Sequence, residues 1–250
     1  MRIREYSDAI PKPMVPIGEK PILWHVMKYY AHFGHKDFIL CTGYKGDVIK
    51  EYFAKNGSVN GVEKILPAKH DLSDWNITVV DTGRTATVGQ RLKAVQPWLK
   101  NDEMFLANYT DALTDLHFPE YFDYFSKRKK IASFLCVRPS QQFHVVSTTG
   151  DMVQEIARVD QSNTWMNGGF FIFRREFFDY LNEDEDLVET PFQRLIQSEE
   201  LVAYKYRGFW VAMDTFKERQ RLEDVLATGN APWELWKRKL TAASDSGEHA

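Results

Sequence analysis

Glu103-Met104-Phe105-Leu106-Ala107-Asn108-Tyr109-Thr110-Asp111 is the stretch that decides the fold. It starts as an apolar run without alternation, from Met104 to Ala107, and ends abruptly in polar residues. Such a run predicts a strand buried on both faces, as in a parallel sheet. Asp111 follows where the strand ends, and open α/β sheets bind ligands beyond the carboxyl ends of their strands. Asp111 is therefore a candidate metal ligand; the alternative is a turn residue that caps the next segment.

A second apolar run that ends in a carboxylate lies far down the chain, at Trp210-Val211-Ala212-Met213-Asp214. Two aspartates at strand ends could together hold one hard cation such as Mg²⁺. Near the N-terminus, Lys12 stands between Pro11 and Pro13, which hold it in extended geometry. A lysine with so little freedom suits a fixed anion; the alternative is a proline-rich loop with Lys12 in water.

Composition narrows the class of protein. The chain has 250 residues, 44% of them hydrophobic, and a net charge of -3, which fits one large or two small globular domains. Nucleic-acid binding would need a clustered basic face. The basic run Lys127-Arg128-Lys129-Lys130 is instead expected to be a solvated loop between a helix and a strand.

The cysteines and the hydropathy pattern bear on location. Cys41 and Cys136 each lie in an apolar strand-like run, which predicts free thiols in a reducing compartment, with one disulfide as the alternative. No apolar run approaches the ~20 residues of a membrane span, and the first residues lack a signal-peptide core. We therefore expect a cytoplasmic protein with no membrane or nucleic-acid partner. The histidines have no metal-ligand spacing.

Helical and strand patterns alternate along the chain, which predicts a doubly wound α/β fold. Thr149-Gly150-Asp151 separates two strand patterns and predicts an antiparallel hairpin from residue 143 to 158. Thr215-Phe216-Lys217-Glu218 is a capping-box pattern that predicts a helix start. No linker divides the chain, so a single domain is expected over residues 1–240, followed by a disordered tail at 241–250.

An ordered set of motifs covers nearly the whole chain. It resembles the bacterial sugar-1-phosphate nucleotidylyltransferases, and most of all their glucose-1-phosphate cytidylyltransferase branch. The motifs, in chain order, are Pro11-Lys12-Pro13-Met14-Val15-Pro16-Ile17-Gly18-Glu19-Lys20-Pro21-Ile22-Leu23-Trp24-His25, Gly43-Tyr44-Lys45-Gly46, Val80-Asp81-Thr82-Gly83, Gly89-Gln90-Arg91-Leu92-Lys93, Asn167-Gly168-Gly169-Phe170-Phe171, Gly208-Phe209-Trp210, Met213-Asp214-Thr215 and Ala231-Pro232-Trp233.

The resemblance implies a fold, a reaction and a set of site residues. The fold would be a Rossmann-like mixed, mainly parallel sheet with helices on both faces, of the nucleotide-diphospho-sugar transferase type. The reaction would join a nucleoside triphosphate, with CTP favoured, to a sugar 1-phosphate, with glucose 1-phosphate favoured, and release pyrophosphate. Mg²⁺ would be held by Asp111 and Asp214, with Lys12 as the third catalytic residue. Nucleotide would be bound by Arg2, Lys12, Gly89, Gln90 and Arg91, and sugar phosphate by Arg158, Asn167, Gly168 and Glu189.

Two departures from the family pattern matter. The family begins with an apolar strand and a glycine-rich loop ending in Gly-Thr-Arg, whereas here only Arg2 would match that loop. We therefore expect a shortened chain that binds nucleotide poorly and unfolds easily, and that gains melting temperature and turnover when the strand and loop are added. The family's Glu-Lys-Pro motif is replaced by Arg158-Val159-Asp160, in which Arg158 could still supply the cation.

Two other functions stay open. One is a catalytically weak or inactive relative that binds nucleotide or sugar phosphate. The other is a nucleotide-sugar glycosyltransferase, which would need an Asp-x-Asp metal motif; Asp111 and Asp115 are too far apart for that. The sequence leaves the base, the sugar and the choice between a monomer and a homo-oligomer undecided.

Overall fold

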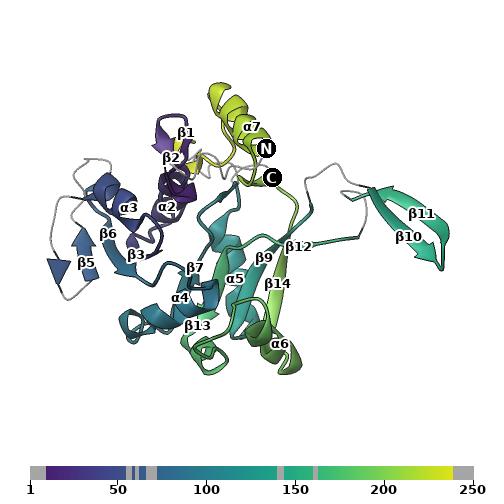
Figure 1. Cartoon of the computed structure of the whole chain (residues 1–250), viewed down its shortest axis with the longest axis horizontal. Coiled ribbons are helices and arrows are strands. Elements are labelled where there is room, and N and C mark those ends of the chain that lie inside the picture. The colour runs from purple at the N-terminus through teal and green to yellow at the C-terminus, as the bar shows by residue number, and fades with distance from the viewer. Residues whose placement is uncertain are drawn as a thin grey trace, which may run out of the picture.

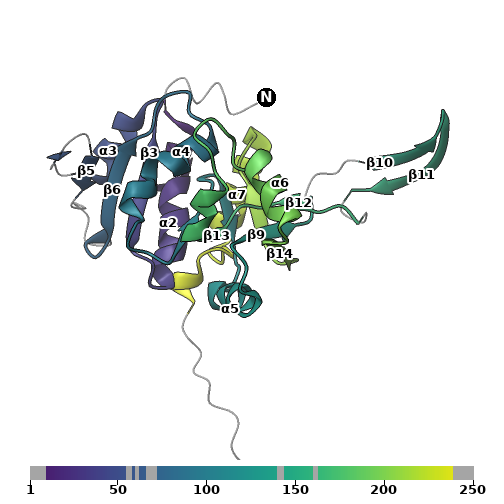
Figure 2. The ribbon, with the colours of Figure 1, turned by 90° about the horizontal axis from the view of Figure 1, so that it is seen from below.

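The computed structural model describes residues 10–54, 58–59, 62–65, 72–139, 144–159 and 163–238. Helices and strands alternate, and helices lie on both sides of the strands (Figures 1 and 2). The α-helices are α2 (Ile22–His32), α3 (Gly46–Phe53), α4 (Val88–Val95), α5 (Phe118–Arg128), α6 (Thr190–Gln197) and α7 (Phe216–Ala227). The 3-10 helices are η1 (Lys12–Met14), η3 (Gln96–Trp98), η4 (Arg175–Asp179) and η5 (Leu235–Lys237). The strands are β1 (Pro16–Ile17), β2 (Lys20–Pro21), β3 (Asp37–Thr42), β4 (Ser58–Val59), β5 (Val62–Ile65), β6 (Asn76–Asp81), β7 (Met104–Ala107), β8 (Ala112–Thr114), β9 (Ala132–Val137), β10 (His144–Thr149), β11 (Met152–Arg158), β12 (Met166–Asn167), β13 (Phe171–Arg174), β14 (Leu201–Tyr206) and β15 (Trp210–Ala212).

The described strands form two larger sheets. One has the order β12-β9-β13-β7 with β14 also paired to β9, and the other has the order β3-β6-β5-β4. The β3–β6 and β9–β14 pairs are parallel, and the remaining described pairs are antiparallel. The expected mixed sheet is therefore confirmed, but the expectation that parallel pairs predominate is wrong for the described strands.

The pairing of β7 shows why parallel pairs do not predominate. It pairs with β13 in antiparallel register, from Phe171 opposite Ala107 to Arg174 opposite Met104. Along β13, Ile172 lies in the core under α2 and α5, whereas Phe171 and Phe173 lie in the core under α6. β13 is thus buried on both faces, whereas in β7 Phe105 is buried and the other three residues are only partly buried. An apolar run without alternation reports burial on two faces and does not fix the direction of the neighbouring strand.

Among the described strands, β7 and β3 are each paired along one edge. The expectations for Arg2 and for residues 241–250 concern positions outside the described residues, and they remain predictions. The expected gain in melting temperature and turnover from an added N-terminal strand and loop also remains a prediction.

Local sequence signals account for several helix ends. Thr215 accepts a hydrogen bond from the Glu218 backbone, and the Glu218 side chain accepts one in return, so the predicted capping box is confirmed. α7 is followed by Gly229 at φ 73°, the left-handed conformation that ends helices.

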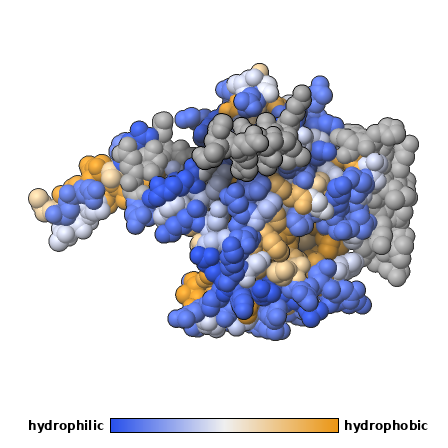
Figure 3. Space-filling model, turned by 180° about the vertical axis from the view of Figure 1, so that it is seen from behind, coloured by the Kyte–Doolittle hydropathy of each residue, from blue (hydrophilic) through white to orange (hydrophobic). Residues whose placement is uncertain are grey.

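The predicted hairpin is confirmed as β10 and β11, which project from the body as an arm (Figures 1 and 2). Its large apolar side chains are exposed, Met152 by 70% and Ile156 by 62%, and the arm carries apolar surface near its tip (Figure 3). Cys41 and Cys136 are free thiols. Across the described residues, no helix is both long enough and apolar enough to span a bilayer.

His25 ties the first helix to the C-terminal segment. Its side chain is 3% exposed. The Trp233 indole N–H donates to Nδ1 at 3.3 Å, so Nε2 carries the proton and donates to the Ile17 carbonyl at 3.1 Å. Burial lowers the pKa of His25, because a charged imidazolium would lose its hydration in the core and the neutral ring is therefore favoured.

A pH dependence of stability follows. The pKa of His25 is lower in the folded chain than its ordinary unfolded value of about 6.5. As pH falls, His25 is therefore protonated at a higher pH in the unfolded chain than in the folded chain. The folded state keeps its full stability above pH ~6.5 and loses part of it as pH falls through the folded pKa. Thermal unfolding between pH 5 and 7.5 measures this. His25→Gln, which keeps a donor and an acceptor, should flatten the curve; an unchanged slope would contradict the assignment. Some slope should remain, because burial also lowers the pKa values of His32 and His35.

Candidate active site

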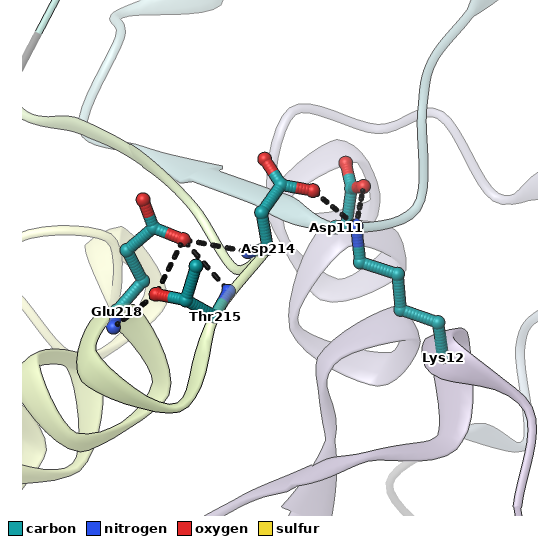
Figure 4. Close-up of polar contacts among 5 residues, drawn as sticks. All are labelled: Lys12, Asp111, Asp214, Thr215 and Glu218. Atoms are coloured by element: carbon teal, nitrogen blue, oxygen red, sulfur yellow. Dashed lines mark hydrogen bonds and ion pairs between the residues drawn. The ribbon is translucent and has the colours of Figure 1, made fainter. Parts of the chain in front are cut away.

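Three charged side chains from distant parts of the chain meet at one point (Figure 4). The Lys12 ammonium donates to Asp111 Oδ2 at 2.6 Å and to Asp214 Oδ1 at 2.6 Å. The side chains of Lys12 and Asp111 are half-buried, with exposed fractions of 33% and 24%, whereas that of Asp214 is 63% exposed. The structure therefore brings together the two strand-end aspartates and the proline-flanked lysine that the sequence had singled out.

Backbone pairing fixes the two carboxylates relative to each other. Strands β8 and β15 are antiparallel, with Ala112 opposite Ala212. The Met213 amide continues this ladder by donating to the Asp111 carbonyl at 2.8 Å. Asp111 immediately precedes β8 and Asp214 closely follows β15, so the two side chains leave the same end of a short rigid ribbon.

Helix α7 links this ribbon to the segment that carries Lys12. The Glu218 carboxylate accepts from the Asp214 amide at 2.8 Å and from the Thr215 amide at 2.8 Å (Figure 4). Further along the helix, Arg219 donates to the Pro16 carbonyl at 3.2 Å and Glu223 accepts from the Gly18 amide at 3.0 Å. The turn that follows Lys12 is thereby fastened to the helix that follows Asp214.

The charge of Lys12 is firmly held. Burial by itself would lower the pKa of the ammonium, but the charges of Asp111 and Asp214 and their hydrogen bonds outweigh burial and raise the pKa above its ordinary value. Lys12 is therefore a cation at every physiological pH. It neutralises part of the charge of two carboxylates that would otherwise repel each other.

The two carboxylates are close enough together to be candidate ligands of one divalent cation. Both oxygens lie 2.6 Å from one nitrogen, and Mg²⁺ binds carboxylate oxygens at about 2.0–2.1 Å. A shift of a few tenths of an ångström per side chain would close the gap. The described residues hold no group of three or more potential metal-binding side chains. Mg²⁺ commonly takes one or two protein carboxylates and completes its shell with substrate phosphates and water.

Three residues expected to bind the nucleotide, Gly89, Gln90 and Arg91, lie in the first turn of α4. Gly89 is buried, and Gln90 accepts from the Thr87 amide at 2.8 Å within a second capping box. Arg91 donates to the Thr42 carbonyl at 3.0 Å and to the Thr82 hydroxyl at 2.7 Å. These contacts position the loops after β3 and β6, and a direct role in base recognition stays a proposal.

The residues expected at the sugar lie around the bend between β12 and β13. Asn167 accepts from the Gly169 amide at 2.9 Å and donates toward the Tyr109 hydroxyl at 3.5 Å. Both backbone groups of Gly168 are hydrogen-bonded within the protein. Its amide donates to the Leu135 carbonyl, and its carbonyl accepts from the Trp210 indole N–H. Glu189 is exposed just before α6.

Arg158, the residue expected to bind the sugar phosphate, is placed differently. It is exposed at the base of the arm, opposite His144 in the β10–β11 ladder. Its contact with a sugar phosphate stays a proposal.

The chain is similar to known proteins along nearly its whole length. The profile of the Nucleotidyl transferase family matches residues 1–218. The glucose-1-phosphate cytidylyltransferase of Salmonella typhimurium is 38% identical over 245 residues, which cover 94% of this chain and 95% of that protein. The chain belongs to the nucleotidyl transferase family. The resemblance inferred from its motifs is thereby confirmed.

Other relatives of this nucleotidyl transferase agree. The probable glucose-1-phosphate cytidylyltransferase of Bacillus subtilis is 32% identical over 94% of this chain and 95% of that protein. The solved structure of UDP-glucose pyrophosphorylase complexed with UDP-glucose superposes with a TM-score of 0.66 at 13% identity, over 90% of this chain and 93% of that one. A putative glucose-1-phosphate thymidylyltransferase from Bacillus anthracis gives 0.66 at 15% identity, over 88% of each chain. These two structures support the fold.

One neighbour of the site in this nucleotidyl transferase, Asn108, has a role that its sequence context does not indicate. Asn108 follows β7, and its Oδ1 accepts from the Phe170 amide at 2.8 Å, while its Nδ2 is buried with no hydrogen-bond partner among the described residues. Phe170 has φ 52° and Gly169 φ 75°. The Asn-Gly-Gly motif could have indicated this tight bend, but only the fold shows that Asn108 holds it.

Gly89 offers a prediction about the nucleotide loop. A Cβ there would lie 2.2 Å from the Glu185 carbonyl oxygen and 3.0 Å from the Leu187 amide nitrogen. Because both atoms belong to the backbone, Gly89→Ala should lower the free energy of unfolding by about 1–3 kcal/mol and displace α4. Urea unfolding measures this, with Val88→Ala on the adjacent exposed residue as control. Equal stability of the two variants would show that the close approach is not maintained in solution.

Proposed function

We propose that this nucleotidyl transferase moves a cytidylyl group from CTP to glucose 1-phosphate and releases pyrophosphate. The observation that carries the proposal is the convergence of Lys12, Asp111 and Asp214 at the ends of two strands. The nucleotide and the sugar are taken from the two relatives that are 38% and 32% identical and that carry the cytidylyltransferase name. Mg²⁺ as the metal and a cytoplasmic location are part of the same proposal.

The proposed chemistry needs no protein nucleophile. An oxygen of the sugar phosphate attacks the α-phosphorus in line, the new bond forms between them, and the bond to the β-phosphate breaks so that pyrophosphate leaves. Asp111 and Asp214 would hold Mg²⁺, which supplies charge neutralisation for the phosphate oxygens. Lys12 would turn from the carboxylates to the triphosphate, where its positive charge stabilises the same oxygens. Asn167 and Glu189 would orient the sugar.

The carboxylate Asp115 weighs against the glycosyltransferase alternative. It accepts hydrogen bonds from the Tyr206 hydroxyl and, at 2.8 Å, from the Phe209 amide. It is thus engaged in holding the loop between β14 and β15. An Asp-x-Asp metal pair at the end of β7 has no support from this arrangement.

The test is pyrophosphate release. The purified chain is incubated with Mg²⁺, glucose 1-phosphate and one triphosphate at a time, which is CTP, UTP, dTTP, ATP or GTP. The rate of pyrophosphate release is measured with a coupled assay. We expect turnover with CTP and a much lower rate with the others. Turnover with another triphosphate would change the base. Nucleotide binding without any turnover would favour the inactive relative.

A further inference from the structure

Residues 185–189 form a short segment that contacts the start of α4. The Thr87 hydroxyl, which caps α4, donates to the Glu185 carbonyl at 3.1 Å. The backbone of Gly89 approaches the same carbonyl so closely that a Cβ on Gly89 would lie 2.2 Å from its oxygen. Both contacts are made to the backbone of Glu185, so the position of the first turn of α4 depends on where that backbone is held.

The same segment also approaches the residues expected to bind the sugar. Burial raises the pKa of the Tyr109 hydroxyl, and the negative charge of Asp186 raises it further, which places that charge near the hydroxyl. The Tyr109 hydroxyl is the group that the Asn167 amide reaches at 3.5 Å. Glu189, which is also expected at the sugar, ends the segment just before α6. One short stretch of backbone therefore connects the nucleotide side of the proposed site to the sugar side.

An ion pair between Glu185 and Arg194 holds this segment to α6. The Arg194 guanidinium donates from Nη1 to Glu185 Oε2 at 2.6 Å and from Nη2 to Oε1 at 2.5 Å. Asn182 donates to the same carboxylate from its backbone and from its side chain, at 3.1 Å each. Arg194 also donates to the Tyr180 carbonyl at 2.9 Å. A bidentate arginine fork fixes the direction as well as the distance of its partner.

This loop depends on its polar contacts more than on apolar packing. Among residues 182–189, only Leu187 is buried, in the core cluster that also contains Leu92 of α4. The hydrogen bonds from Arg194 lower the pKa of Glu185 to about 2, so the carboxylate stays ionised near neutral pH. Partly exposed ion pairs contribute little to the stability of a whole fold. What this pair supplies is a fixed position for the Glu185 backbone.

We propose that Glu185 and Arg194 are positioning residues that couple the binding of the nucleotide to the binding of the sugar phosphate. The pair fixes residues 185–189, and these residues contact both sides of the site. A substrate that orders the segment from one side leaves less of it to be ordered when the other substrate binds, so the second substrate binds more tightly. This inference rests on the proposed function, because it takes its two substrates from that reaction.

The variants that test the proposal break the pair while keeping the size of the side chains. They are Arg194→Gln, Glu185→Gln and the double variant. Arg194→Lys is the conservative variant, because it keeps the charge but loses the fork. The matched control is Asp123→Asn/Lys127→Gln, which removes an exposed ion pair of α5 with an N–O distance of 2.6 Å.

The quantity to measure is the ratio of two dissociation constants for glucose 1-phosphate. Calorimetry with Mg²⁺ gives one value for the protein alone and one with saturating α,β-methylene-CTP, an analogue that cannot release pyrophosphate. We expect a ratio of about ten in the wild type, within the usual range of coupling between sites. The ratio should fall below about two in Arg194→Gln and Glu185→Gln, fall no further in the double variant, and be intermediate in Arg194→Lys. The control should keep the wild-type ratio.

This ratio distinguishes positioning from a merely structural role, because a general loss of stability would weaken both dissociation constants alike. A ratio near one in the wild type, an unchanged ratio in Arg194→Gln or an equal fall in the control would overturn the inference. If pyrophosphate is released in any of those cases, the proposed function still stands. If the ratio depends on the pair but no triphosphate is turned over, the proposed function fails and the coupling stands. A wild type that binds neither ligand overturns both.

Discussion

Asp111→Asn is expected to lower kcat by about 10²–10³-fold, the size of effect seen when one preorganised electrostatic contact to a transition state is removed. Asparagine keeps the shape of the side chain and one oxygen, but it removes the negative charge that would hold the metal. The loss should be partly recovered at high Mg²⁺ concentration, because the substitution weakens metal binding rather than the reaction itself. Steady-state kinetics at several Mg²⁺ concentrations measures this.

Asp115→Asn is the matched control for that experiment. It neutralises a carboxylate just beyond the other end of β8, and an amide oxygen can still accept the hydrogen bonds from Tyr206 and Phe209. Its kcat should stay within a few-fold of the wild type. Asp111→Asn should unfold at nearly the wild-type temperature, because partly exposed ion pairs contribute only about 0–1 kcal/mol. Equal kinetic losses in both variants would remove the special role of Asp111.

The meeting of Asp111 and Asp214 could be predicted because strand ends are strongly marked in this sequence. The apolar runs marked the strands near both carboxylates, although Asp111 lies four positions beyond the end of β7 and immediately before β8. The proline neighbours of Lys12 gave a weaker signal, since restricted geometry says nothing about direction. Its direction is set by contacts made more than two hundred positions later, where Glu223 and Arg219 of α7 hold the turn after it.

Other features depend on register and partners that sequence patterns do not contain. Arg91 has the residue type of a phosphate ligand, yet its guanidinium holds Thr42 and Thr82. The existence of β7 was readable from its apolar run, whereas the antiparallel direction of β13 was not.

Lys12→Met is expected to have opposite effects on turnover and on metal binding. The Lys12 ammonium contacts both Asp111 and Asp214, the two carboxylates that are proposed to hold the divalent cation. A metal that enters must displace it, so the lysine acts as a competing internal cation. Removing it should tighten the nucleotide-free affinity for Mg²⁺ or Mn²⁺ by about tenfold, equivalent to about 1.4 kcal/mol.

Turnover should nevertheless fall. In the proposed mechanism the displaced ammonium moves to the triphosphate, and loss of that positive charge should raise KM for CTP and lower kcat by a combined factor of about 10² or more. Mn²⁺ titration followed by electron paramagnetic resonance measures the affinity without nucleotide, and steady-state assays measure the loss of turnover. The two readouts move in opposite directions only if one side chain serves both sites.

Lys217→Met separates contact from general electrostatics. Lys217 is an exposed cation on α7 just beyond Asp214, so its removal changes the local field without vacating the space between the carboxylates. Its effect on Mn²⁺ affinity should be small and should fade in 0.2 M salt, because exposed charges are screened over about 8–10 Å. The gain in Lys12→Met should persist in that salt, because direct displacement at 2.6 Å is screened far less. If Lys12→Met bound Mn²⁺ no more tightly than Lys217→Met, the ammonium would not be occupying the cation position in solution.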